Sequence, residues 1–517
     1  MNEGRAPAGG YFPGDWVRPR VNPGGWTPIL DTQEVHTGNR STDGSGLHRT
    51  YDVPVGVALR VEEAAKSPPF LEQEGHSPKS IRVWRDGEGY HVIYDSGEGI
   101  RVAHSDDALR WHSPEGEAGR LRVGAGDLFK SVFEDPSAPP GERFKGMGCD
   151  GGWFDPQTGQ RMDSGGEGAA NEEAERRWAA QEYQGPAYTG PRVELTGHAT
   201  GWTSPDRIAW TELDKPVASF PMDGGLSAGY DAATGHYFAY TRVHGVAVEP
   251  DTAPTVGSGS GEVGLVRRAI GLTRTRDFRS WPPPKLILAP DGQDDLDVSF
   301  YGADYFPYPG RSDLHCMLVQ VYHQASDHVD SQLACSRDGL FWHRPERRPI
   351  IPVGPPGSGD AGMVYSWGSG MIELPDGSWG SLYGGASWLH NAGAPPGASG
   401  ELRWATWRPH RVVGIEAELE GRFTIPTIFR TSDELRLNYR CMPGRSVRVE
   451  LLHAVPSRIH ADVAPVAGLT FVECEPLTGD AVDQVVRWNG HSDISAVGEM
   501  VGILTRLERA KLFAYAV

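Results

Sequence analysis

The sequence predicts an all-β protein, a five-bladed β-propeller followed by a C-terminal β-sandwich. Two observations predict the propeller: a seven-residue segment occurs four times, and short strand-like runs precede the copies. Repetition over tens of residues indicates a radial or stacked architecture, and the irregular intervals favour blades with different insertions over a tight solenoid. A third observation predicts the sandwich. Beyond residue 408 the repeat is absent, and apolar residues alternate with polar ones as in half-buried strands.

The repeat has the form Ser/Thr-x-Asp-x-x-x-Trp. Its copies are Ser105–Trp111, Ser204–Trp210, Thr275–Trp281 and Ser336–Trp342. A hydroxyl residue and an Asp two positions later favour a turn, because both side chains bond nearby backbone amides. The Trp can then cover a large apolar area. We therefore predict that each copy is a turn between two strands and that its Trp is buried.

The pattern divides the chain into three parts. Residues 1–50 are rich in Gly and Pro and are expected to form an irregular arm. Residues 51–407 hold the five blades, with strand clusters at 78–114, 125–210, 226–281, 296–342 and 363–407. The second cluster carries an insertion, Ala169–Tyr183, whose Ala, Glu and Arg content predicts a short helix. Residues 408–517 form the sandwich.

Composition excludes several classes of protein. With 67 Gly and 41 Pro in 517 residues, the chain suits a β protein with many turns. Its net charge of −19 argues against nucleic acid as a partner. No apolar run approaches the length of a membrane span, and the N-terminus has no apolar core typical of a secretory signal.

The five cysteines are scattered and form no Cys-x-x-Cys pair, which indicates a reducing cytoplasm and no cysteine zinc site. We predict a cytoplasmic protein with no cofactor and no metal. The sequence leaves open whether copies of the chain form a homo-oligomer.

Acidic residues lie beside the first strand of each cluster, where the blades of a propeller converge. They are Glu74, Asp135, Asp223, Asp297 and Asp360. Convergent carboxylates are what cleavage of a glycosidic bond needs, because one acid protonates the leaving oxygen while a carboxylate attacks the sugar or activates water. The competing interpretation is that each is a solvated turn residue, since the chain has 68 acidic residues.

Six further residues are candidates for binding a sugar. Aromatic faces stack on sugar rings, and histidines at strand ends can act as acids or bases. Arginine can also pair with a carboxylate of the substrate. The candidates are His76, His198, Arg242, Tyr301, Trp367 and Trp388.

The layout resembles glycoside hydrolases with a five-bladed propeller, namely the invertase-like family 32 and the arabinanase-like family 43. The residues that carry the likeness are Phe133-Glu-Asp-Pro136 and the following Arg143-Phe-Lys-Gly-Met-Gly148. Asp135 matches the Asp of the Arg-Asp-Pro motif of family 32, which stabilises the transition state. The resemblance thus implies a propeller glycosidase with Asp135 as a catalytic residue.

Two family motifs differ in this chain. Ser77, in His76-Ser-Pro-Lys-Ser80, stands where family 32 has its nucleophilic Asp. The nearest match to the acid motif Glu-Cys-Pro is Glu473-Cys-Glu-Pro476, which falls in the predicted sandwich. The likeness therefore implies a distant branch and does not carry fructan specificity with it.

The leading hypothesis is a glycoside hydrolase that cleaves oligosaccharides in the central pocket of the propeller with paired carboxylates. One alternative is a sialidase-like or phosphorylase-like propeller enzyme, because the repeat resembles the sialidase Asp box. Another is a non-catalytic carbohydrate-binding propeller. A central pocket with two or more carboxylates within about 10 Å of each other favours the hydrolase, and a flat, aromatic and carboxylate-free face favours the binding protein.

Overall fold

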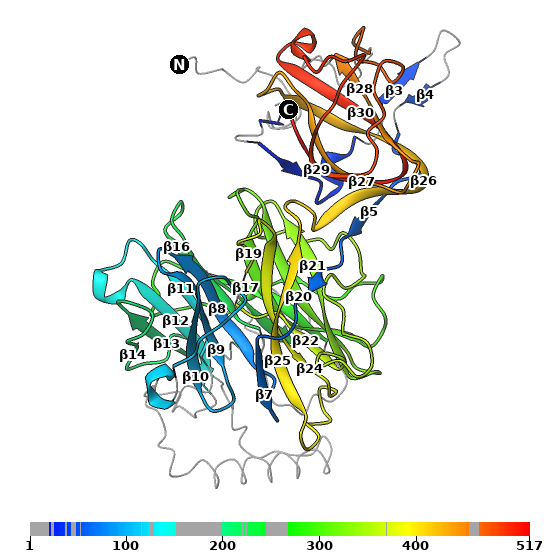
Figure 1. Cartoon of the computed structure of the whole chain (residues 1–517). Helices are drawn as coiled ribbons and strands as arrows, with labels where there is room; N and C mark the ends of the chain where they lie inside the picture. The colour runs from blue at the N-terminus through cyan, green and yellow to red at the C-terminus, as the bar shows by residue number, and fades with distance from the viewer. Residues whose placement is uncertain are drawn as a thin grey trace, which may run out of the picture. The chain divides into compact units, whose positions relative to one another are not determined.

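The protein is an all-β chain, and its structure is a computed structural model (Figure 1). Every element in the described residues is a strand or a short 3-10 turn. These residues are 20–21, 25–36, 39–42, 48–51, 53–114, 116–121, 123, 129–150, 198–218, 222, 225–244, 267–368, 370–453 and 465–517. The predicted helix at 169–183 lies outside them. The chain divides into two compact units, residues 1–63 with 407–517 as unit 1 and residues 64–406 as unit 2.

Unit 2 is built from antiparallel sheets that follow one another along the chain. The first contains β8 (Lys79–Asp86), β9 (Gly89–Asp95) and β10 (Ile100–Ser105). The second contains β11 (Phe129–Glu134), β12 (Phe144–Asp150), β13 (His198–Ser204) and β14 (Thr211–Glu212). The third contains β15 (Ser227–Asp231), β16 (His236–His244), β17 (Arg268–Thr275) and β18 (Lys285–Leu288).

The remaining strands of unit 2 form one nine-stranded sheet. They are β19 (Val298–Pro307), β20 (His315–His323), β21 (His328–Ser336), β22 (Met363–Tyr365), β23 (Ile372–Glu373), β24 (Trp379–Ala386), β25 (Ser399–Trp407), β6 (Ala65–Lys66) and β7 (Leu71–Glu74). A single parallel pair, Val329 with Met363, joins β21 to β22. The last sheet thus consists of two antiparallel groups, and one parallel residue pair joins their strands.

The four copies of the repeat are turns, and each starts at the last residue of a third strand: β10, β13, β17 or β21. In the first copy, Oδ1 of Asp107 accepts the backbone N–H groups of Leu109 and Arg110 at 2.8 Å. The same two bonds occur at Asp206 and Asp338. The Asp satisfies donors that the turn removes from the sheet, so the prediction of a turn is confirmed.

Each repeat Trp packs against a different apolar cluster, and its indole N–H donates to the carbonyl of the residue three positions earlier. Trp281 is buried, as predicted. Trp111, Trp210 and Trp342 are only partly buried, because the indole of each lies at the rim of its cluster. The prediction of four buried tryptophans is therefore right for one and too strong for three.

The first strands of the sheets are linked to one another in a closed order. β8 lies beside β11. Hydrogen bonds to or from polar side chains then link β11 to β15, β15 to β19, β19 to the segment after β22, and that segment back to β8. These bonds join Ala228 N to Ser131 Oγ, Tyr305 N to Ser227 Oγ, Gly370 N to Asp304 Oδ2, and Ser80 Oγ to the carbonyl of Trp367. Five segments far apart in sequence therefore meet around one centre.

The residues that precede the first sheet complete the last one. β6 pairs with β25 at Lys66 and Ala405, and β7 pairs with β25 from Leu71 to Glu74. The beginning and the end of unit 2 are consequently held side by side in one sheet.

Unit 1 centres on two strands of seventeen residues, β26 (Val413–Phe429) and β30 (Met500–Ala516) (Figure 1). Around them lie β1 (Arg20–Val21), β2 (Thr27–Pro28), β5 (Ala58–Val61), β27 (Arg436–Cys441), β28 (Val447–His453) and β29 (Asp480–Val485), and β3 (Asn39–Thr42) pairs with β4 (His48–Tyr51). Parts of the predicted irregular arm are thus strands. Residues 58–61, expected in the propeller, pair with β26.

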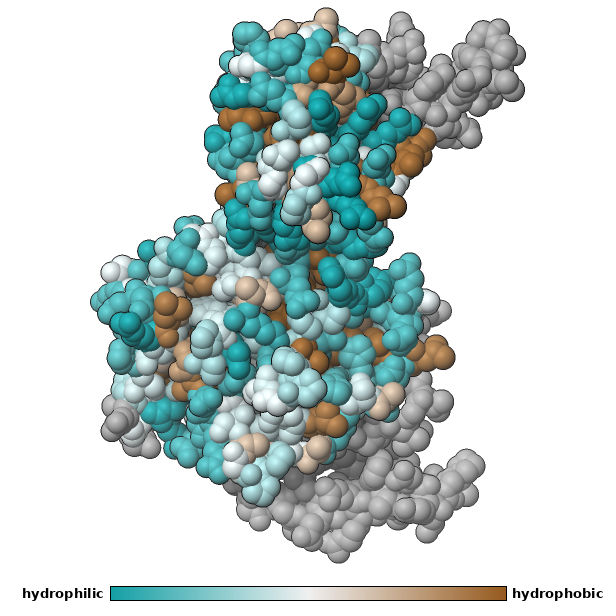
Figure 2. Space-filling view, turned by 45° about the vertical axis from the view of Figure 1, so that its right-hand side comes forward, coloured by the Kyte–Doolittle hydropathy of each residue, from teal (hydrophilic) through white to brown (hydrophobic). Residues whose placement is uncertain are grey.

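The visible surface in Figure 2 is mostly hydrophilic, with apolar residues in small groups. Several large exposed apolar side chains belong to the repeat turns, namely Leu109, Ile208, Leu340 and Phe341. They are exposed because the turn directs them outward while its Trp points inward. Within the described part of the chain, no helix has the length and apolar character needed to cross a membrane.

Candidate functional site

The centre where the first strands meet holds a group of aromatic rings. Tyr301 comes from β19, Tyr365 ends β22, and Trp367 follows two residues later. The ring of Tyr365 lies 6.1 Å from that of Tyr301 and 6.1 Å from that of Trp367. Tyr301 is partly exposed, whereas Tyr365 and Trp367 are buried.

Two lysines point at these rings. Lys79 begins β8, and its Nζ lies 5.0 Å from the ring centre of Trp367 and 5.7 Å from that of Tyr365. Lys130, at the second position of β11, places its Nζ 4.6 Å from the ring centre of Trp367. A cation over an aromatic face gains about 0.5–2 kcal/mol. The two ammonium groups therefore share one indole.

Two arginines occupy the other side of the group. Arg242 on β16 and Arg268 on β17 lie 5.0 and 5.1 Å from the ring centre of Tyr301. Because the register pairs Arg242 with Ile270 and His244 with Arg268, the two arginines fall on one face of the third sheet. Arg242 is buried and Arg268 is partly exposed.

His390 and Asp327 lie beside the aromatic group and bond to its neighbours. His390 Nδ1 lies 3.0 Å from the hydroxyl of Tyr365, and burial lowers the pKa of this histidine. Asp327 accepts the hydroxyl of Tyr322 at 2.9 Å and two N–H groups of Asn391 at 2.7 and 2.8 Å. Burial opposes ionisation of Asp327, but these bonds outweigh it and hold its pKa below the usual value. Asp327 thereby attaches the segment carrying His390 to the β20–β21 hairpin.

We call this set the central cluster. It comprises Lys79, Lys130, Arg242, Arg268, Tyr301, Tyr322, Tyr365, Trp367 and His390. Its members come from all four sheets of unit 2.

A carboxylate and a histidine border the cluster next to Lys79. Asp95 ends β9 and is the register partner of Lys79, so their side chains share a face. Oδ2 of Asp95 lies 3.5 Å from Nε2 of His76, a residue that is only partly buried. Burial opposes ionisation of Asp95, yet the contacts with His76 and with the N–H of Gly97 hold its pKa below the usual value.

The structure brings together three of the sequence-predicted binding residues, Arg242, Tyr301 and Trp367, in the central cluster. Trp388 is buried in the same apolar cluster as Tyr365 and Trp367. For His198 the structure describes the backbone, which begins β13 opposite Asp150.

Asp360 lies in a buried network away from open space. Its Oδ2 accepts Lys66 Nζ at 2.6 Å and the hydroxyl of Tyr383 at 2.9 Å, and its Oδ1 accepts Ser358 Oγ at 2.8 Å. Burial opposes its ionisation, but Lys66 and these bonds keep its pKa low. Burial raises the pKa of neighbouring Glu401, with Asp360 adding to the effect. These contacts indicate a structural anchor between β6, β24 and β25.

Asp135 lies at the other end of its strand from Lys130. It follows the last residue of β11, is 1% exposed, and accepts bonds from Ser137 N, Ser137 Oγ and the hydroxyl of Tyr237. Burial opposes ionisation, but these bonds outweigh it and lower the pKa of Asp135. Its hydrogen-bond partners in the described residues do not include another candidate carboxylate.

Of the other three acids, the structure describes Asp297 and Glu74. Asp297 accepts the N–H of Ala325 at 2.9 Å and so caps the β20–β21 turn. Glu74 is exposed on β7, and Asp223 lies outside the described residues. Among the described residues, no hydrogen bond or ion pair joins Glu74, Asp135, Asp297 and Asp360 to one another.

A Lys-Ser pair shared by two first strands could have predicted the central cluster. Lys79-Ser80 and Lys130-Ser131 stand at the start of two first strands. In each pair the Ser bonds the neighbouring segment and the Lys faces the centre. Neither lysine is among the acidic, histidine, arginine and aromatic residues predicted from the sequence.

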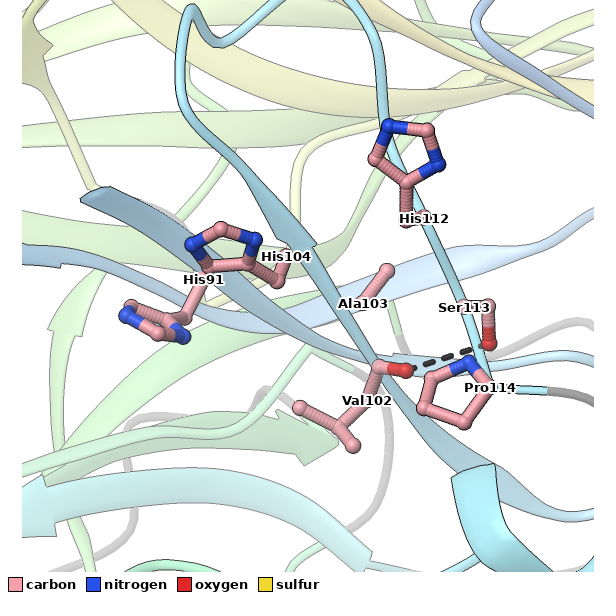
Figure 3. A pocket seen from close by; sticks show the side chains of 7 residues that line it. All are labelled: His91, Val102, Ala103, His104, His112, Ser113 and Pro114. Carbon is pink, nitrogen blue, oxygen red and sulfur yellow. Dashed lines mark hydrogen bonds between the residues drawn. The ribbon is translucent and has the colours of Figure 1, made fainter. Parts of the chain in front are cut away.

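A separate hollow of about 430 Å³ lies on the first sheet. Figure 3 shows His91 and His104 side by side in it, with His112 farther along and Ser113 bonded to the carbonyl of Val102. His91 Nε2 lies 3.0 Å from Asp86 Oδ1, and His104 Nε2 lies 2.7 Å from the carbonyl of Glu88. The Nε2 atoms of His91 and His104 therefore already have partners within the protein. In the ranges described, no three His, Cys, Asp or Glu side chains group as metal ligands would.

No family model and no curated protein matches the chain. Solved structures with partial likeness include one titled glycoside hydrolase, at 14% identity over 68% of this chain and 93% of that one, with a TM-score of 0.42. Another is a thermostable family-43 glycoside hydrolase, at 12% identity over 64% and 91%, with a TM-score of 0.38. A third is sucrose-6-phosphate hydrolase from Lactobacillus gasseri, at 9% identity over 87% and 93%, with a TM-score of 0.35.

At such TM-scores the likenesses assign no activity to this chain.

Proposed function

We propose that the chain is a glycoside hydrolase whose active centre is the central cluster of a five-bladed propeller, with the tail as a β-sandwich. The observation that carries this proposal is the convergence of aromatic faces and charged groups from every sheet of unit 2 on Trp367 and Tyr301. The closed order of the five first strands supports the blade count. A sugar ring needs stacking faces and directed polar groups together, and the cluster supplies both.

The acid and base roles are proposed for His76 and Asp95. Asp95 holds one ring nitrogen of His76, so the other is available to protonate the glycosidic oxygen as the bond to the anomeric carbon breaks. Water then adds to that carbon, and its proton returns to the histidine. The low pKa of Asp95 supports this division, because an ionised carboxylate stabilises both the imidazolium and an oxocarbenium-like transition state.

A panel of nitrophenyl glycosides and natural oligosaccharides tests the activity. On the substrate that the panel identifies, we expect His76→Gln and Asp95→Asn to lower kcat by about 10²-fold or more. His112→Gln, outside the cluster, is the matched control and should keep the wild-type rate. Turnover that survives both changes, in variants with an unchanged Tm, rules out this pair. Asp135 with Asp223, Asp297 or Asp360, the assignment from sequence, would then be tested next.

Binding of an oligosaccharide with no turnover of any compound would support the carbohydrate-binding alternative instead. A reducing compartment is also part of the proposal. Cys316 and Cys335 are register partners on β20 and β21 and are free thiols, which fits the cytoplasm predicted from the sequence.

A further inference from the structure

Lys79 and Lys130 are unusual among the lysines of this chain. Lys66, Lys145 and Lys511 are also largely buried, and each has a carboxylate partner: Asp360 at 2.6 Å, Glu142 at 3.1 Å and Glu62 at 3.0 Å. Lys79 and Lys130 are partly buried, yet within the described residues neither Nζ makes a hydrogen bond or an ion pair.

The arrangement costs free energy in the absence of an anion. Two ammonium groups over one indole repel each other, and withdrawal from water disfavours the charge of Lys79. Burial, with Lys130 adding to the effect, lowers the pKa of Lys79 to about 8. Asp95 opposes this shift, but its own bonds go to His76 and Gly97. A purely structural pair would be replaced by apolar residues at little cost, so the two charges indicate a ligand.

The rest of the cluster extends the positive region. Arg242 and Arg268 lie over Tyr301, and the Tyr301, Tyr365 and Trp367 rings connect them to the two lysines. The nearby acid Asp327 is occupied by Tyr322 and Asn391. Four cations thus border one set of aromatic faces.

We infer that the central cluster recognises an acidic sugar, whose anionic group lies between Lys79 and Lys130. This inference rests on the proposed function for its choice of a carbohydrate. The anion is a carboxylate or a phosphate, since an ammonium group binds either as a point charge.

Isothermal titration of the whole chain tests the inference. The probes are D-glucuronate and D-galacturonate for the carboxylate, D-glucose 6-phosphate for the phosphate, and D-glucose and D-galactose as neutral controls. We expect one acid to bind about 10- to 100-fold more tightly than its neutral counterpart. The better of the acid and the phosphate identifies the anion.

Variants localise the effect. Lys79→Met and Lys130→Met keep the length of the side chain and remove the charge, so each should lower the affinity for the acid about 10-fold and leave that for the neutral sugar unchanged. Lys285→Met, at an exposed position on β18, is the matched control and should change neither. Equal affinity for acidic and neutral sugars, a preference that both variants retain, or no binding of any acid overturns the inference.

The outcome is separable from that of the proposed function. Tight binding of an acid without cleavage of any glycoside keeps the inference and removes the hydrolase. Cleavage of neutral glycosides, with no effect of Lys79→Met on kcat/KM, keeps the hydrolase and removes the inference.

Discussion

The ammonium groups of Lys79 and Lys130 lie over the same indole, 5.0 and 4.6 Å from its centre, although the two lysines belong to different sheets. Each stands at the start of a first strand and precedes a Ser that bonds the next segment. The same local sequence therefore builds the closed order of strands and directs charge to its centre. The charged groups at the centre and the bonds that join the strands thus come from neighbouring residues.

Lys79→Met should raise the free energy of unfolding at pH 7 by about 1 kcal/mol or more, because it removes a desolvated charge without a carboxylate partner. The folded pKa of about 8 lies below the unfolded value near 10.4, so the wild type is penalised below pH 8 and recovers as the pH rises toward 10. The difference in Tm between variant and wild type should therefore shrink between pH 8 and pH 10. Lys130 and Asp95 are the charged groups that also face the Lys79 ammonium group. A difference in Tm that does not change with pH would show that the effect does not come from the charge of Lys79.

The repeat turns give a matched pair of changes. Ala108 and Gly339 occupy equivalent positions, and both have a left-handed backbone, with φ of +60° and +71°. Ala108→Gly should stabilise the protein by up to about 1 kcal/mol, and Gly339→Ala should destabilise it by at least that much. A Cβ at Gly339 would also meet the hydroxyl of Tyr240 at 3.0 Å. Urea titration measures both, and a loss of stability in Ala108→Gly would mean that its buried methyl outweighs the backbone effect.

Lys66→Met should cost about 3–5 kcal/mol, because it leaves the carboxylate of Asp360 buried without its cation. Adding Asp360→Asn to Lys66→Met should restore part of the loss. Glu74→Gln, at an exposed position on β7, should change stability by less than about 0.5 kcal/mol. Thermal unfolding provides the comparison, and additive effects of the two changes would show that Lys66 and Asp360 do not interact.

Asp135→Asn separates two roles for Asp135. Its bonds to Ser137 and Tyr237 predict a loss of about 1–3 kcal/mol in stability and an unchanged affinity for sugars. Because its pKa is lowered on folding, its contribution is present above pH 4 and is lost as the pH falls through the folded value. The advantage of the wild type should therefore fade in acid. A kcat reduced by orders of magnitude at an unchanged Tm would instead support the catalytic role predicted from sequence.

The fold was more accessible from sequence than the site. The spacing of Ser, Asp and Trp in the repeat is enough to predict a turn, because the bonds of Asp107 are made within four residues of it. The strands of the tail also follow from alternation, as at β27 and β28. Local chemistry of this kind is written in the sequence.

The site depends on contacts between distant segments, which no local pattern reveals. Asp360 resembles a catalytic acid in sequence, but its partner Lys66 lies almost 300 residues away on β6. The pairing of Asp95 with His76 depends on the β8–β9 register. The burial of three repeat tryptophans was overestimated because sequence does not tell the rim of a cluster from its interior.

The pairing of β6 and β7 with β25 has a consequence for biosynthesis. The first strands to leave the ribosome from unit 2 have their partner more than 300 residues later, at Ser399–Trp407. Unit 1 has the same dependence, since β5 must wait for β26. Unit 2 cannot finish folding until β25 has been translated, and unit 1 must wait for β30 near the C-terminus, so the early sheets must remain soluble while their neighbours are still being made.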